Sequence, residues 1–460
     1  MNENSYTRRD FLKAAGVGAA GVTIGLSALG GARRAVAAPI HQGSAIVKAD
    51  PINHGGPVII SGGKVIQPQR EIRVLRETDV LVVGGGTAGV IAAISAARAG
   101  ADVTLVERYG CFGGLWTGGL VLIVLSTHAR VGGKLTKCVR GIGDEMLQRH
   151  LKIPGGIINQ APGKSNPTSD PEVTKYLMAE MVREAGVHVV LHSWVTNAIM
   201  DKGTVRGVVL ESKSGPMAIK AKVVIDASGD GDVFGAAGAE NIRHTHRIGL
   251  VHRLGGVDTV DRAKARKAGV KLPRFGAATP IPGVTWVNMQ GPTADCLDVE
   301  ALSKIEMDDR AAIWKRMAEI HKVPGCEKVF VLDTASQLGI RTSRTLVGTQ
   351  EITIKNAKAR KTYDDVVGVG GSYSLTGGAS CAIPYGSLLP AKIDNLLAAG
   401  RCVAADNLML NYTRLIAPCM VTGHAAGAAA AVAVADKTTP RKVNVAKVQK
   451  LLKKQGAHLG

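Results

Sequence analysis

The clearest pattern along the chain is a short apolar run that ends in a cluster of glycines. Residues 79–83 read Asp-Val-Leu-Val-Val, and a continuous run of this kind is typical of a parallel strand buried on both faces. The glycine-rich stretch at 84–89 ends the strand. An alanine-rich helix is predicted over 90–99, with Gly100 as its stop signal. A second apolar run at 102–106 completes one β-α-β unit.

A second unit with the same rhythm is predicted farther along the chain. A helix is expected over 171–184 and a strand over 188–194. Paired strands are expected over 196–200 and 205–211, and another buried strand over 222–227. The two units together indicate an α/β fold built on a parallel sheet.

The rest of the chain divides into two kinds of sequence. Residues 236–380 lack the rhythm of parallel strands and carry more charge, so we expect an inserted α+β domain there. After it come a buried strand at 396–399, a long alanine-rich helix at 422–435 and an amphipathic helix at 443–455. The pattern therefore predicts a Rossmann-like domain that is interrupted by a second domain.

The N-terminus resembles an export signal rather than a folded element. Residues 7–13 read Thr-Arg-Arg-Asp-Phe-Leu-Lys, which matches the twin-arginine (Tat) pattern. A weakly apolar stretch follows at 14–31, and Ala-Val-Ala at 35–37 offers a cleavage site. A membrane anchor would need about 20 strongly apolar residues, which this stretch lacks. We predict a signal peptide over 1–37, recognised by the Tat translocase, and a periplasmic or otherwise exported protein.

Composition narrows the class of protein. The 460 residues carry a net charge of +20, and removal of residues 1–37 takes away five basic and two acidic residues, which leaves +17. A basic surface favours anionic partners, whereas export and an aromatic content of 3% argue against nucleic acid. The seven cysteines include no C-x-x-C pair, so the spacings of zinc and iron–sulfur sites are missing and no metal is expected.

Gly84, Gly86 and Gly89 form a G-x-G-x-x-G pattern between the first strand and its helix. In this setting the first glycine permits a tight turn, the second lets the backbone approach a pyrophosphate, and the third lets helix and strand pack closely. The helix start supplies N–H groups for phosphate oxygens. Glu107, at the end of the next strand, is expected to accept hydrogen bonds from a ribose. This pattern suits both FAD and NAD.

Further segments decide between the two cofactors. Gly-Gly stands at 113–114, Asp-Ala-Ser-Gly-Asp-Gly-Asp at 226–232, and Ala-Ala-Gly-Arg at 398–401. The stretches at 340–348 and 383–390 belong to the same set of motifs. Together these segments resemble the FAD-dependent oxidoreductase family with a glutathione-reductase-like FAD-binding domain, in the branch with an Asp-Ala-Ser/Thr-Gly-Asp-Gly-Asp motif. The resemblance spans nearly the whole chain after the signal and implies FAD as the cofactor.

The resemblance also implies which residues contact FAD. The turn glycines would hold the pyrophosphate and the glutamate the adenosine ribose, while other residues would line the path of the cofactor, contact adenine or lie near the ribitol. Thr422-Gly423-His424 is expected to open the last long helix and to aim N–H groups at the flavin. The implied cofactor-binding residues are Gly84, Gly86, Gly89, Glu107, Arg108, Gly114, Val195, Asp232, Gly400, Arg401 and Gly423.

The sequence pattern and the resemblance together predict that the chain has five parts. They are a twin-arginine signal peptide (1–37), an N-terminal extension (38–74), the first part of the FAD-binding domain (75–235), a substrate or cap domain (236–380) and the second part of the FAD-binding domain (381–460).

A flavin performs hydride chemistry itself, so the protein is expected to supply orientation and charge. Arg341 and Arg344 lie three residues apart, and on a turn they would clamp a carboxylate of the substrate. Salt bridges to Asp364 or Asp365 are the structural alternative. His252 and Tyr385 are candidates for a base near the flavin, although Tyr385 also suits a core position.

The sequence thus predicts an exported FAD-dependent dehydrogenase that oxidises a small organic substrate, anionic if the arginines bind it. The flavin would accept the hydride. Electrons would pass to a quinone, a cytochrome or oxygen, because free nicotinamide cofactors are scarce outside the cytoplasm. The alternatives are a reductase of an activated C=C bond and a flavin-holding binding protein without turnover.

Overall fold

The computed structural model describes most of the chain after the predicted signal peptide. That signal peptide, and with it the predicted cleavage site, lies outside the described residues. The described residues are 58–67, 69–159, 167–371 and 373–460.

A mixed sheet of seven strands forms the centre of the fold, in the order β10-β11-β12-β3-β4-β9, with β23 also paired to β12. Strands β3, β4, β9, β12 and β23 pair in parallel, and β10 and β11 extend the sheet antiparallel. This is the α/β arrangement that the apolar runs predicted. The strands are β3 (Arg73–Val83), β4 (Val103–Val106), β9 (His188–Val190), β10 (Trp194–Asp201), β11 (Thr204–Ser212), β12 (Gly215–Asp226) and β23 (Leu396–Ala398).

Helices pack against this sheet and against each other. The predicted helix at 171–184 is confirmed residue for residue as α4, since Asp170 caps it by accepting hydrogen bonds from the N–H groups of Glu172 and Val173 and Pro171 fits the first turn. The main core joins these helices to the buried strands. The helices are α2 (Thr87–Arg98), α3 (Ile142–Leu151), α4 (Pro171–Glu184), α11 (Ile416–Ala435) and α12 (Val445–Lys454).

Helix α11 begins at Ile416, six residues before the predicted start at 422. Pro418 lies in the first turn, where a proline gives up no hydrogen bond. By length and composition α11 is the one helix of the described chain that would suit a membrane span. However, 89% of its apolar window is buried inside the fold, as in the core helix of a globular domain.

Two glycines let α11 approach α2 closely. A Cβ added at Gly423 would lie 2.2 Å from the carbonyl oxygen of Ala88, and one at Gly427 would lie 2.2 Å from that of Ala92. Because glycine has no Cβ, the two helix backbones lie almost in contact. This packing fixes where the start of α11 lies relative to the start of α2.

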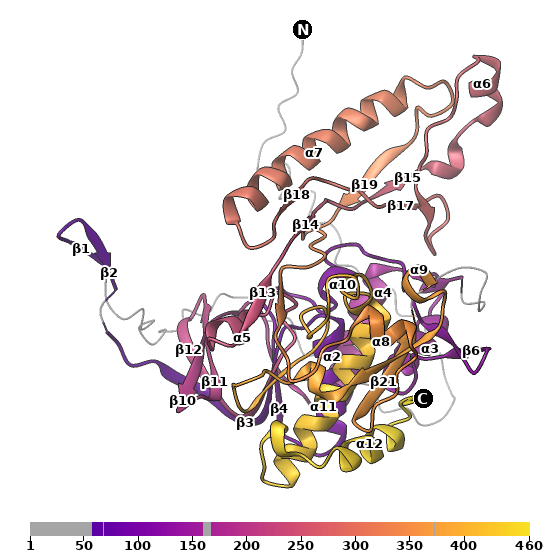
Figure 1. Ribbon diagram of the computed structural model, residues 1–460. Coiled ribbons are helices and arrows are strands. Elements are labelled where there is room, and N and C mark those ends of the chain that lie inside the picture. Colours follow the sequence, from indigo (N-terminus) through magenta and orange to yellow (C-terminus); the bar gives the residue numbers. More distant parts are fainter. Residues whose placement is uncertain (1–57, 68, 160–166, 372) are drawn as a thin grey trace, which may run out of the picture. The chain divides into compact units, whose positions relative to one another are not determined.

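A second region has its own hydrophobic clusters, formed almost entirely by residues between Ile248 and Ile340. A four-stranded sheet with the order β16-β17-β15-β19 lies here, and α7 runs along it (Figure 1). Later residues such as Leu346, Ile352 and Val367 belong to the main core again. The boundaries at 235/236 and 380/381 stay predictions. The elements are β15 (His252–Gly255), α6 (Arg262–Lys267), β16 (Ala277–Ala278), β17 (Thr285–Val287), α7 (Val299–His321) and β19 (Phe330–Thr334).

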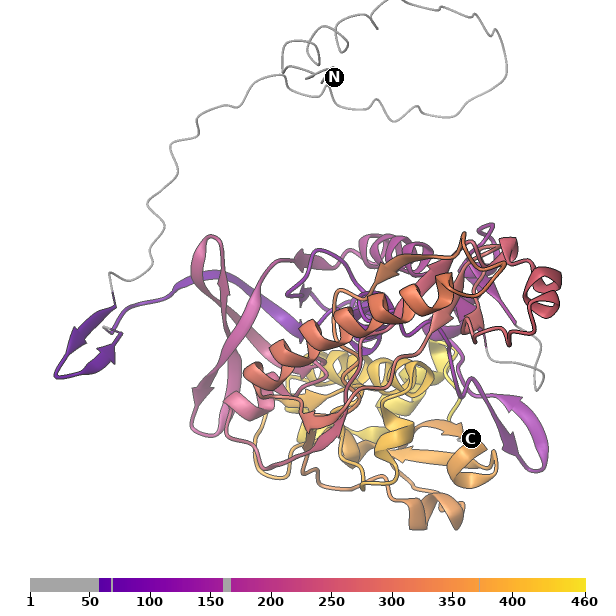
Figure 2. The same ribbon diagram turned by 90° about the horizontal axis from the view of Figure 1, so that it is seen from above.

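Short elements complete the fold. The hairpin of β1 and β2 precedes β3 and shows in indigo in Figures 1 and 2, where its residues are exposed. The short strands form two-stranded antiparallel pairs. They are β1 (Ile59–Ser61) with β2 (Lys64–Ile66), β5 (His128–Val131) with β6 (Lys134–Lys137), β13 (Asn241–Arg243) with β20 (Arg344–Leu346), β14 (Thr245–Arg247) with β18 (Thr293–Asp295), and β21 (Val366–Gly371) with β22 (Ser380–Pro384).

An ion triad, in which Arg253 and Asp170 are buried and Asp333 is partly exposed, ties the second region to α4 of the main core. The guanidinium of Arg253 on β15 lies 2.6 Å from a carboxylate oxygen of Asp333 on β19 and 3.2 Å from one of Asp170. Asp170 is also the cap of α4. The same carboxylate therefore holds a helix of the main core and a strand of the second region.

The close packing of α11 on α2 makes Gly423 a sensitive position. We expect Gly423→Ala to lower the free energy of unfolding by about 1–3 kcal/mol, because the new Cβ would push the two backbones apart. Thermal unfolding followed by circular dichroism measures this loss. The matched control is Ala435→Val at the exposed end of the same helix, which should change stability by less than about 0.5 kcal/mol. Unchanged stability with loss of cofactor would instead support the predicted role of Gly423 in cofactor binding.

Candidate active site

The turn after β3 brings three backbone segments together. Gly84 has φ +99°, and a Cβ there would lie 2.5 Å from the carbonyl oxygen of Ala227 at the end of β12. A Cβ on Gly89 would lie 1.8 Å from the carbonyl oxygen of Gly84. Both positions therefore require glycine, as expected for a tight turn and for close packing of helix on strand.

Gly86 differs from its two neighbours in the pattern. Its φ is −70°, an ordinary conformation for any residue, and the nearest atom to an added Cβ is the Cα of Gly114 at 3.9 Å. An added side chain would therefore extend into open space in front of the start of α2. This geometry matches a glycine that makes room for a ligand rather than for the protein itself.

Glu107 closes the same turn from the end of β4. Its Oε2 accepts a hydrogen bond from the N–H of Gly85 at 2.6 Å, and its Oε1 accepts one from the N–H of Tyr109 at 2.9 Å. Burial raises the pKa of Glu107, although both hydrogen bonds act in the opposite direction. A carboxylate has about four acceptor positions, so two remain for the ligand in the cavity that Glu107 lines.

A cavity of about 420 Å³ extends from this turn to the second region of the protein. Its size lies within the range of small-molecule and cofactor sites. Glycines at one end leave the backbone open to a ligand, and aromatic, amide and arginine side chains line the rest. The lining includes Gly84, Gly86, Thr87, Glu107, Arg108, Gly114, Leu115, Trp116, Trp286, Asn288, Gln337, Ile340, Arg341, Gly400, Arg401, Arg414, Ile416 and Cys419.

The start of α11 lies at this cavity. Leu415 and Ile416 line it, and the N–H groups of the first turn of the helix have no partners within the helix. The prediction that Thr422-Gly423-His424 opens the helix is wrong, because the helix starts six residues earlier and these residues are buried in its interior. Thr422 contributes indirectly, since its Oγ1 accepts a hydrogen bond from the N–H of Gly400.

The Asp-Ala-Ser-Gly-Asp-Gly-Asp motif lines the cavity with Ala227, Ser228 and Gly229, whereas its aspartates act within the protein. Asp226 accepts hydrogen bonds from the N–H groups of Val233 and Phe234 and so holds the start of α5 (Asp232–Ala236). Asp230 lies 2.7 Å from the guanidinium of Arg401. Asp232 does not line the cavity, and burial, followed by repulsion from its neighbouring aspartates, raises its pKa to about 6.

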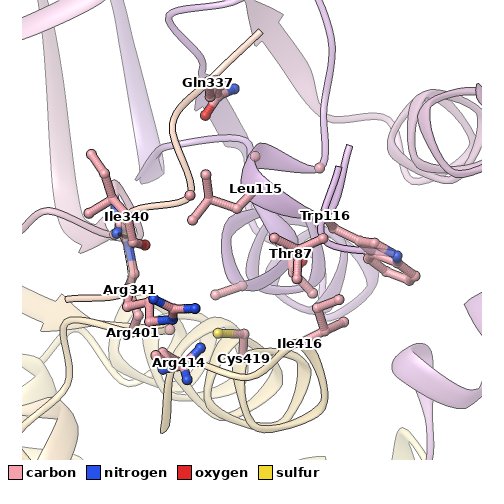
Figure 3. A pocket seen from close by; sticks show the side chains of 18 of the residues that line it. Thr87, Leu115, Trp116, Gln337, Ile340, Arg341, Arg401, Arg414, Ile416 and Cys419 are labelled. Carbon is pink, nitrogen blue, oxygen red and sulfur yellow. Dashed lines mark hydrogen bonds between the residues drawn. The ribbon is translucent and has the colours of Figure 1, made fainter. Parts of the chain in front are cut away.

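The predicted pairing of Arg341 with Arg344 does not form. Arg341 lines the cavity and donates to the carbonyl of Arg247 at 3.1 Å. Arg344, the first residue of β20, points elsewhere: it donates to the carbonyl of Gly231 at 3.2 Å and lies 3.9 Å from Asp232. The segment is not helical, so residues three apart lie on different sides of the chain. Figure 3 shows that Arg401 and Arg414 are the neighbours of Arg341 instead.

His252 and Tyr385 also lie outside the cavity lining. Tyr385 is buried in the main core and donates its hydroxyl hydrogen bond to the carbonyl of Pro440 at 2.7 Å. His252 is buried on β15, where burial lowers its pKa to about 4. The structure therefore gives neither residue a contact with a ligand in this cavity.

Seven of the eleven predicted cofactor residues line the cavity: Gly84, Gly86, Glu107, Arg108, Gly114, Gly400 and Arg401. The other four do not. Gly89 and Gly423 serve close packing, Val195 is buried on β10, and Asp232 lies at the start of α5. The prediction omitted Arg414, because no motif marks the loop before α11 and its position depends on how that helix packs.

Comparison with known proteins identifies the ligand of the turn. The model of the family described as FAD dependent oxidoreductase matches residues 79–246 and 251–452. The model of the TAT (twin-arginine translocation) pathway signal sequence matches residues 5–25. The cofactor is therefore FAD, and the protein is exported by the Tat pathway to the periplasm, as predicted.

Individual relatives match only part of this chain. Digeranylgeranylglycerophospholipid reductase 2 of Methanopyrus kandleri is 32% identical over 153 residues, which cover 33% of this chain and 38% of that protein. Digoxin reductase of Eggerthella lenta is 32% identical over 150 residues, covering 32% of this chain and 24% of that protein. The crystal structure of a geranylgeranyl bacteriochlorophyll reductase-like protein of Thermoplasma acidophilum has a TM-score of 0.43 and 17% identity, and covers 83% of this chain and 84% of that one.

The open space in front of Gly86 gives a direct test of the cofactor site. We expect Gly86→Val to fold, because its backbone conformation suits valine, but to be purified without FAD, because the side chain fills the space for the pyrophosphate. Absorbance of the purified protein and of its denatured supernatant measures the FAD content, and circular dichroism measures folding. A folded variant with full FAD content would contradict this assignment.

The signal sequence gives a second test. Changing Arg8 and Arg9 to lysine should block export, and the precursor that stays in the cytoplasm should already contain FAD, because the Tat route carries folded proteins. Immunoblots of cytoplasmic and periplasmic fractions, with FAD measured in the purified precursor, check both points. Export at the wild-type level would show that the arginine pair is not required.

Proposed function

Because the chain belongs to the FAD dependent oxidoreductase family, we propose that it is a periplasmic dehydrogenase that oxidises a small organic substrate. The observation that carries this proposal is the continuity of one cavity. The FAD turn with Gly84 and Glu107 lines one part of it, and Trp286 and Gln337 of the second region line another. A substrate in the second part would thus share the cavity with FAD.

The residues present fit an extended FAD. The cradle at Gly86 leaves room for the pyrophosphate beside the N–H groups that start α2, and Glu107 has acceptor positions for the ribose. The start of α11 would face the flavin, where the positive end of the helix dipole stabilises negative charge. FAD, when bound, supplies the hydride chemistry. The chain orients the reactants and excludes water.

The second region would provide the substrate side of the site. Trp286 is fixed in place by a hydrogen bond from its indole N–H to the carbonyl of Leu120. Asn288 and Gln337 present amide groups among largely apolar neighbours. A few polar groups in an apolar wall are what a site needs to orient a small molecule. For the electron acceptor we propose a quinone, a cytochrome or oxygen, because the protein works outside the cytoplasm.

Reduction of an activated C=C bond is the second candidate. It is favoured by the names of two relatives, a digeranylgeranylglycerophospholipid reductase and a digoxin reductase, although each match covers about a third of this chain. The sequence also allowed a flavin-holding binding protein without turnover. We set this alternative aside because the family is one of oxidoreductases.

Anaerobic spectroscopy of the holoprotein distinguishes the two directions. If the protein is a dehydrogenase, a substrate from a panel of small alcohols, amines and hydroxy acids should bleach the oxidised flavin, and a dye should restore it. If it is a C=C reductase, the panel should leave the flavin oxidised, while an unsaturated compound should reoxidise flavin that was reduced by light. If an unsaturated compound reoxidises the reduced flavin and no compound of the panel bleaches the oxidised flavin, the dehydrogenase proposal is overturned. The Gly86→Val variant serves as the control without cofactor.

A further inference from the structure

Two arginines face the cavity without a counter-charge. Four arginines line the cavity in all. Arg401 is paired with Asp230, and the guanidinium of Arg108 lies 5.0 Å from the centres of two neighbouring aromatic rings. Arg341 and Arg414 have no acidic partner within the described part of the chain, and Figure 3 shows their guanidinium groups on the same side of the cavity as Arg401.

Arg414 is the more isolated of the two. Its side chain makes no hydrogen bond or ion pair with any residue that the structure describes, and its Nε is buried without a partner. Burial, followed by repulsion from Arg341, lowers its pKa to about 10. The group is still charged at neutral pH. A charge that has lost part of its water and gained no partner is unfavourable unless a ligand supplies the missing interactions.

Arg341 shares this environment. Its one hydrogen bond goes to the backbone carbonyl of Arg247, which carries no full charge. Burial, followed by repulsion from Arg247, lowers the pKa of Arg341 as well. The two guanidinium groups therefore repel one another in a partly buried space. An anion between them would remove this repulsion and fill the free donor positions.

The protein itself offers no such anion. Among the described residues that line the cavity, Glu107 is the only acidic side chain, and both of its oxygens already accept backbone hydrogen bonds at the dinucleotide turn. The missing negative charge must therefore arrive with a ligand. Two sources are open: the phosphates of FAD and a carboxylate of the substrate.

The origin of the two arginines favours the substrate. Neither belongs to the segments that shape the FAD turn, which are β3 with α2, the end of β4 and the end of β12. Arg341 follows Ile340 at the edge of the second region, and Arg414 precedes the start of α11. Phosphate oxygens at the turn already have the N–H groups at the start of α2 as donors.

We propose that Arg341 and Arg414 form a binding site for a carboxylate group of the substrate. The planar guanidinium of each arginine can donate two hydrogen bonds to carboxylate oxygens, which gives orientation as well as charge. The site rests on the proposed function, because it assumes a substrate in the cavity beside FAD. It replaces the predicted pair of Arg341 and Arg344 and narrows the substrate class to organic acids.

Titration of the holoprotein with small acids tests this site without requiring turnover. Benzoate and succinate are the probes, benzamide and succinamide are their neutral matches, and perturbation of the flavin spectrum reports binding. We expect the carboxylates to bind at least about tenfold more tightly than the amides. Arg414→Gln and Arg341→Gln should each weaken carboxylate binding by about 10- to 100-fold while FAD content stays at the wild-type level.

Arg344→Gln is the matched control, since it removes a nearby arginine that does not line the cavity, and it should leave carboxylate binding unchanged. If Arg414→Gln does not fold, Arg341→Gln at a less buried position gives the same comparison. Equal binding of amides and carboxylates, or wild-type carboxylate affinity in both glutamine variants, would overturn the proposal. Loss of FAD in these variants would also overturn it, because the anion would then be a phosphate of the cofactor.

The carboxylate titration and the flavin-bleaching experiment can succeed or fail independently of each other. Bleaching of the flavin by an uncharged alcohol, together with no carboxylate binding, would remove the anion site and leave the dehydrogenase intact. Carboxylate binding that depends on Arg414, together with no bleaching by any compound of the panel, would support the site and count against the dehydrogenase.

Discussion

The whole site depends on how closely the backbone can approach itself at Gly84. The carbonyl oxygen of Gly84 occupies the space where a side chain of Gly89 would lie. A side chain on Gly84 would in turn collide with the backbone of Ala227. Any Cβ at Gly84 or Gly89 would push apart the ends of β3, α2 and β12. Because these ends are held together, the N–H groups that start α2, the carboxylate of Glu107 and the motif after β12 all meet at one edge of the sheet.

A second close approach transmits this arrangement to the other end of the chain. Gly423 and Gly427 place α11 directly against α2, so the position of one helix start determines the position of the other. Arg414 and Ile416 consequently reach the cavity although more than 300 residues separate them from the turn. The contact between α11 and α2 therefore positions both the cofactor side and the proposed substrate side of the cavity.

The sequence predicted the features that rest on local pattern. Apolar runs predicted the parallel strands, and glycine spacing predicted the FAD turn. It failed where tertiary packing decides. The start of α11 was predicted six residues too late, although Pro418 is compatible with the first turn of a helix. The partner of Arg341 was missed because side-chain direction in an irregular segment, and the approach of a distant loop, cannot be inferred from spacing.

Arg401 links these local and distant features. In the structure its guanidinium pairs with Asp230 and donates to the carbonyl of Ile340 at 2.9 Å. It thus ties the FAD side to the residue that precedes Arg341. Asp230 neutralises the charge of Arg401, so Arg401 does not compete for the proposed carboxylate. Its hydrogen bond to Ile340 holds the backbone next to Arg341. The unpaired positive charges in the cavity are therefore those of Arg341 and Arg414.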